Sequence, residues 1–162
     1  MKQHFLIQWL TVLSTFIIAL VLEISPWATH FQYFKPSWLV LVLLYWVLAL
    51  PNKVSIGFAF VFGVIWDLVL GSVLGTHALV LSVFAYIIAL NHLILRNLSL
   101  LQQSLLVIIF VAAIRLGIFL LEFFLHDAIF HRQEFYTALV SALLWPWVFL
   151  LLRKIRRQVG LS

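Results

Sequence analysis

The sequence predicts an all-α integral membrane protein with six transmembrane helices and both termini in the cytoplasm. Composition is the first reason: 65% of the 162 residues are hydrophobic and only 9% are charged. A water-soluble domain of this length could not hide that much apolar surface in its interior. The second reason is spacing, because the apolar runs follow one another with connections too short to form a soluble domain. Residues 1–162 are therefore expected to form a single membrane domain.

The apolar runs are separated by turn chemistry. Ser25 and Pro26 end the first run, Pro36 opens the second and Pro51 closes it. The first run is longer than a signal-peptide core and lacks a small-residue cleavage pattern after it, so it is expected to be retained. The predicted spans are about 5–22, 37–50, 56–70, 77–95, 100–125 and 135–152.

The second and third spans are short. At 1.5 Å per residue, fifteen helical residues extend about 22 Å, against roughly 30 Å of hydrocarbon. Either flanking residues lengthen these spans or the bilayer thins around them.

Basic residues predict the orientation, because Lys and Arg are retained on the cytoplasmic side. An inside N-terminus puts seven of them in cytoplasmic segments: Lys2, Lys53, Arg96, Arg153, Lys154, Arg156 and Arg157. Lys35 and Arg132 are in segments on the opposite, outer side of the membrane. The last four cytoplasmic residues follow an apolar run, which indicates an anchor to anionic lipid or a cytoplasmic partner, and not a nucleic-acid site.

The stretch around Asp67 carries most of the functional interest. A carboxylate deep in a bilayer costs roughly 2.5–3.5 kcal/mol. Gly63 and Gly71 lie one turn before and after it, Gly75 follows four residues later, and glycines allow another backbone to approach closely. Two interpretations remain open: an internal packing face with a satisfied carboxylate, or a surface for a ligand or partner.

Arg115 is the only basic residue within a predicted span, and its depth resembles that of Asp67. We therefore predict that the two are paired, directly or through a polar intermediary. In the alternative, Arg115 extends to the membrane surface and Asp67 is protonated. Glu122 lies seven residues after Arg115 on the same helical face. A polar cleft between the third and fifth spans, opening outward toward Glu122 and Glu23, is the candidate ligand site.

The sixth span contains Trp145, Pro146 and Trp147 in succession. A proline inside a helix removes a backbone hydrogen bond and allows a kink, which predicts a bent, packed helix. A lateral docking groove beside the kink is the alternative.

No catalytic or metal-binding pattern emerges. His126, Asp127, His131 and Glu134 crowd one outer loop, but their spacing matches no zinc signature. Asp67 has no second carboxylate at its depth with which to share a proton. No enzyme activity and no cofactor are predicted.

Several stretches together resemble the MreD family of bacterial rod shape-determining inner-membrane proteins. They are Lys35-Pro36-Ser37-Trp38, residues 44–51, Gly63 to Gly75 around Asp67, and Leu144-Trp145-Pro146-Trp147 with the basic tail. The resemblance extends over essentially the whole chain and is nearest to the gammaproteobacterial branch. It implies a six-helix fold similar to the substrate-binding subunits of energy-coupling-factor transporters, in the bacterial inner membrane.

The same resemblance implies a non-enzymatic subunit of the elongation machinery that regulates cell shape and lateral peptidoglycan synthesis. Its implied partners are MreC, the actin-like MreB, the glycosyltransferase RodA and the elongation transpeptidase, directly or indirectly, and a second copy of the chain. The alternative function is a transporter-like component that binds a lipid or small molecule in a cleft around Asp67 and Arg115.

Overall fold

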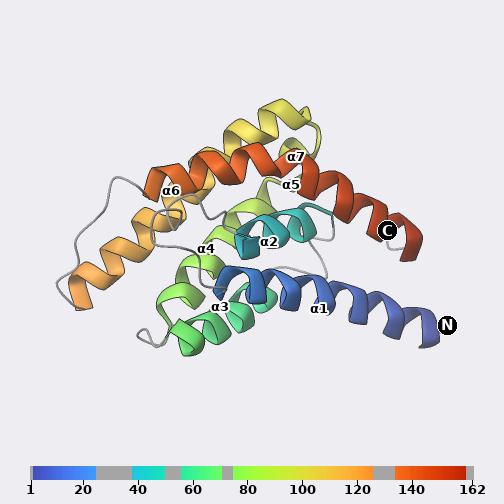
Figure 1. Cartoon of the computed structure of the whole chain (residues 1–162), viewed down its shortest axis with the longest axis horizontal. Helices are drawn as coiled ribbons and strands as arrows, with labels where there is room; N and C mark the ends of the chain where they lie inside the picture. The colour runs from blue at the N-terminus through green and yellow to red at the C-terminus, as the bar shows by residue number, and fades with distance from the viewer. Residues whose placement is uncertain (1, 25–37, 50–55, 71–74, 126–133, 160–162) are drawn as a thin grey trace.

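The computed structural model describes residues 2–24, 38–49, 56–70, 75–125 and 134–159. Every regular element in these ranges is a helix, as the sequence predicted (Figure 1). In chain order the helices are α1 (Lys2–Ile24), α2 (Trp38–Ala49), α3 (Ile56–Leu70), α4 (Thr76–Leu90), α5 (His92–Arg96), α6 (Leu100–Leu125) and α7 (Glu134–Val159).

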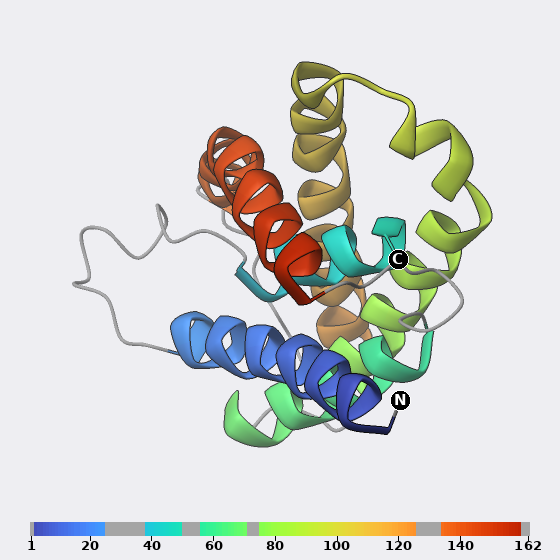
Figure 2. The same ribbon diagram turned by 90° about the vertical axis from the view of Figure 1, so that its right-hand side faces the viewer.

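The centre of the molecule is the short helix α2. All of residues 39–48 are buried, on every side of the helix. A helix that is hydrophobic all round is buried in a protein core or lies in a membrane. Here other helices surround it, because α2 contacts α1, α4, α5 and α7 (Figure 2). Its 12 residues extend only about 18 Å.

Two helical hairpins, α3–α4 and α6–α7, make the most extensive contacts between elements. The helices α3 and α6 cover the same residues as the runs predicted at 56–70 and 100–125. The run predicted at 77–95 is interrupted instead. Asn91 leaves the helical conformation, with φ −109° and ψ 16°, so that α4 ends at Leu90 and α5 forms a separate turn.

Long helices with exposed apolar side chains form the outside of the molecule. Within the described ranges, three helical segments are long and apolar enough to cross a membrane: Phe5–Glu23, Leu100–Phe124 and Tyr136–Gln158. Large apolar side chains on all three are exposed, including Leu10, Ile109 and Leu143. Soluble proteins do not expose apolar surface so extensively, so this chain belongs in a membrane.

The last helix runs further than the predicted span. It continues from the apolar part through the basic residues to Val159 and contains Pro146 in its interior. Figure 1 shows that α7 changes direction along its length. The two flanking tryptophans differ: Trp145 is fully buried, whereas Trp147 is 75% exposed.

Candidate functional site

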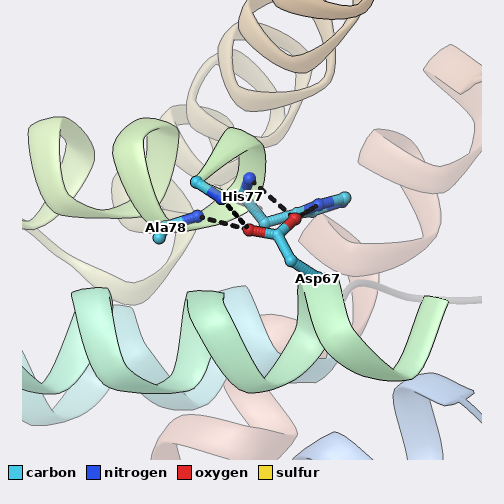
Figure 3. A network of polar contacts seen from close by, with 4 residues as sticks. Asp67, His77 and Ala78 are labelled. Carbon is cyan, nitrogen blue, oxygen red and sulfur yellow. Dashed lines mark hydrogen bonds and ion pairs between the residues drawn. The ribbon is translucent and has the colours of Figure 1, made fainter. Parts of the chain in front are cut away.

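Asp67 is completely buried and turned toward the start of α4 (Figure 3). Its Oδ1 lies 2.6 Å from Nδ1 of His77 and accepts the backbone N–H of the same residue at 3.1 Å. Its Oδ2 accepts the backbone N–H groups of Gly75 at 3.0 Å and Ala78 at 3.4 Å. Both oxygens are therefore bound by the chain itself.

These hydrogen bonds offset the free-energy cost of burying a carboxylate in an apolar helix. The first N–H groups of a helix have no partner within the helix and carry partial positive charge. Asp67 accepts two of them in α4, from His77 and Ala78, and also the N–H of the N-cap residue Gly75. Thr76 and His77 are themselves buried. The buried acid and the start of α4 thus satisfy each other.

Gly75 and Gly63 make the hairpin geometry possible. Gly75 has φ +100°, in the left-handed region, which glycine adopts without steric penalty. Gly63 lies against the backbone of α4: a Cβ there would be 2.7 Å from the nitrogen of Ala78 and closer still to its Cα. A close backbone approach was expected at Gly63, and the backbone that approaches belongs to α4 of the same chain.

A second buried acid, on α1, accepts a backbone N–H at the start of α2 in the same way. Glu23, at the end of α1, is buried, and its Oε2 accepts the backbone N–H of Trp38, the first residue of α2. Its Oε1 lies 3.8 Å from Nη2 of Arg115 on α6. Glu23 therefore joins three helices, and one of its contacts is the start of the central helix.

The charged groups of these helices form one polar cluster, which consists of Glu23, Asp67, His77, Arg115 and Glu122. Arg115 and Glu122 lie near enough to His77 for their charges to act on it. The predicted common inward face of Arg115 and Glu122 agrees with this, since both side chains are half-buried.

Asp67 and Arg115 were predicted to pair, directly or through a polar intermediary. Each has another ionic neighbour in the described part of the chain: Asp67 contacts His77, and Arg115 lies near Glu23. Similar depth in the membrane does not fix the direction in which a side chain points, and α4 offers Asp67 a near set of donors.

Other predicted residues fall outside the described ranges. Gly71 and the loop residues His126, Asp127 and His131 are among them. Glu134 begins α7.

Sequence reasoning placed Glu23 at the opening of the predicted cleft but missed its contact with the start of α2, and it missed His77 altogether. Signals for both contacts were present: His77 follows Asp67 by ten residues across a glycine-containing turn, and Glu23 precedes the proline-bounded start of the next helix. Each acid lies near the end of one helix and just before another. That position indicates a cap for the following helix.

The opposite end of the molecule is tied by different polar contacts. Arg96 donates from Nε and Nη2 to the carbonyl of Leu48, at 3.0 and 2.6 Å, and so caps the C-terminal end of α2. The buried amide of Gln103 donates to the carbonyl of Leu95 and accepts from Nε1 of Trp145. Trp145 thus joins α7 to α6 through this amide.

The basic tail of α7 has two sides. Arg153 and Arg156 are half-buried, whereas Lys154 and Arg157 are exposed. The sequence grouped the four as one anchor.

Fold and polar cluster together define a helical membrane protein in which buried acids cap the starts of internal helices. The sequence profile of the rod shape-determining protein MreD family matches residues 3–155. Rod shape-determining protein MreD of Haemophilus influenzae is 66% identical over 161 residues, which cover 99% of each chain. The chain therefore belongs to the MreD family, whose members determine rod shape. No solved structure matches it significantly.

Proposed function

We propose that this chain is a non-enzymatic subunit of the elongation machinery that holds MreC and cell-wall synthases together in the inner membrane. The observation that carries the proposal is family membership over nearly the full length. MreB, RodA and the elongation transpeptidase are its further partners, directly or indirectly, and a second copy of the chain is another.

The polar cluster supports a scaffold function because its contacts join helices of this chain to one another. Asp67 is fully buried and both of its oxygens are used by α4. A ligand that approached this carboxylate would have to displace the start of α4. This geometry favours the scaffold over the alternative function, binding of a lipid or small molecule around Asp67 and Arg115.

Partners are expected on the exposed apolar faces of the long helices instead. Helices in lipid associate through close packing and polar contacts, with no hydrophobic driving force between them. Hydrogen bonds and ion pairs between the helices hold these faces in a defined arrangement. The polar cluster would therefore affect partner binding indirectly, by setting the positions of the helices.

As part of this proposal, the chain crosses the membrane six times and both of its ends are in the cytoplasm. Figure 1 shows the start of α1 and the end of α7 at one end of the molecule, and the end of α3 with the start of α4 toward the other. The chain contains no cysteine, so single cysteines can be placed without background. Ser99→Cys should resist an impermeant thiol reagent in intact cells, and Ser72→Cys should react.

Site-specific crosslinking in native membranes tests the scaffold. A photoreactive residue is placed at Leu10 on α1, Ile109 on α6 or Leu143 on α7, all exposed. At least one position should capture MreC, and a strain without MreC is the control. If shape-complementing variants capture no MreC at any exposed position on these helices, the proposal is wrong.

A further inference from the structure

A cavity of about 290 Å³ lies at the end of the molecule opposite the acidic caps. It is formed where α2, α5, α6 and α7 meet, and its lining residues are Tyr45, Leu48, Ala49, Arg96, Gln103, Phe149, Arg153 and Arg156. Its size is close to the lower limit for small-molecule sites. Three of the lining residues are arginines and none is acidic.

The arginines come from distant parts of the chain. Arg96 is held in place by its two hydrogen bonds to Leu48, and Arg153 and Arg156 lie about one turn apart on α7. Guanidinium groups bind phosphate oxygens in a bidentate manner and are more weakly hydrated than ammonium groups. Three converging arginines without a counter-charge in the lining form a site for an anion.

Tyr45 supplies an independent observation. The residue is 2% exposed, and its hydroxyl has no hydrogen-bond partner in the described part of the chain. Arg156 lies over its ring, with Cζ 6.0 Å from the ring centroid. Leaving a buried hydroxyl unsatisfied costs about 1–3 kcal/mol. Because Tyr45 lines the cavity, a bound acceptor would remove that cost.

The apolar part of the lining narrows the ligand class. Leu48, Ala49 and Phe149 line the cavity together with the arginines. The cavity therefore has an apolar side as well as a basic one. An anion that carries a hydrocarbon chain matches both halves of this environment.

We propose that this cavity binds the phosphate group of an anionic lipid, with Arg96, Arg153, Arg156 and the hydroxyl of Tyr45 around the phosphate oxygens. The bound lipid would join the tail of α7 to the buried helix α2. Lys154 and Arg157 face away and contribute only the general attraction of a basic surface to an anionic membrane.

Two double variants with equal loss of charge test the site. Arg153→Gln/Arg156→Gln removes cavity arginines, and Lys154→Gln/Arg157→Gln removes exposed charges from the same helix. The full chain is purified in a neutral detergent, and its thermal unfolding is measured with phosphatidylglycerol, with phosphatidylcholine, or with inorganic phosphate. A ligand that binds only the folded protein raises the unfolding temperature.

Phosphatidylglycerol should raise the unfolding temperature of the wild type and of the Lys154/Arg157 variant, whereas the Arg153/Arg156 variant should lose most of the shift. Without lipid, Tyr45→Phe should unfold at or above the wild-type temperature, because it removes the unsatisfied hydroxyl. With lipid it should show a reduced shift. Protection by inorganic phosphate alone would support the site and identify a free phosphate compound as its ligand.

Equal loss of the shift in both double variants would mean diffuse surface attraction and would overturn the proposal. So would the absence of any selective response to phosphatidylglycerol or phosphate; an acidic segment of a protein partner would then be the candidate occupant. Native mass spectrometry gives a second readout: the wild type should retain one phosphatidylglycerol that the Arg153/Arg156 variant does not.

Discussion

One carboxylate oxygen of Asp67 contacts His77 twice, through Nδ1 at 2.6 Å and through the backbone nitrogen at 3.1 Å. The side chain of His77 also lies against Trp66, with ring centroids 4.3 Å apart. The connection between α3 and α4 is therefore a polar joint enclosed by aromatic and apolar groups. Its strength is measurable in the folded protein.

Truncation of the two partners should give different costs. Asp67→Ala leaves three backbone N–H groups and the ring of His77 without their acceptor, and should destabilise the protein by about 2–4 kcal/mol. His77→Ala removes only the ring and should cost about 1–2 kcal/mol. Thermal or denaturant unfolding in detergent shows which variant loses more stability. Glu122→Gln, at a half-buried position, is the control. A larger loss for His77→Ala would contradict this account.

Two glycines of α3 should respond oppositely to alanine. A methyl group at Gly63 would collide with the backbone of Ala78, so Gly63→Ala should cost about 1–3 kcal/mol or more. A Cβ at Gly57 meets nothing within 4 Å, and Gly57→Ala should stabilise the helix by about 0.5–1 kcal/mol. The unfolding temperatures of the two purified variants test this difference. Equal responses would mean that α3 and α4 do not approach as closely as the structure shows.

Arg115 should be coupled to Glu23 more strongly than to Asp67. The double-mutant cycle of Glu23→Gln with Arg115→Met should yield a coupling free energy of about 0.5–1 kcal/mol. A parallel cycle of Asp67→Asn with Arg115→Met should give a smaller value, since Asp67 is bound by α4. If the second coupling were the larger, the pairing predicted from membrane depth would be restored.

The two tryptophans beside Pro146 should also differ. Trp145→Phe leaves Oε1 of Gln103 without its indole donor in a buried place, and should cost about 1–3 kcal/mol. Trp147 is 75% exposed, so Trp147→Phe should leave detergent-solubilised stability nearly unchanged. Gln103→Leu is a further check: it should be at least as harmful as Trp145→Phe, because it also removes the donor to Leu95. Similar unfolding temperatures for both Trp variants would argue against the bond.

The sequence by itself determined the all-helical membrane class, the bounds of α3 and α6, and the close approach of another backbone at Gly63. These features follow from local causes: continuous apolar runs, turn residues, and the cost of charge in an apolar segment. The family resemblance was also readable from the sequence, and the comparisons confirm it.

Only the tertiary structure decided which groups meet. It placed α2 at the centre, turned Asp67 toward His77, joined Glu23 to Trp38 and Arg115, and divided the basic tail into a cavity side and an exposed side. The physical reason is that hydropathy and residue counting give the depth of a side chain along the membrane normal. The direction in which it points depends on how neighbouring helices pack, and that is set by contacts between residues far apart in the chain.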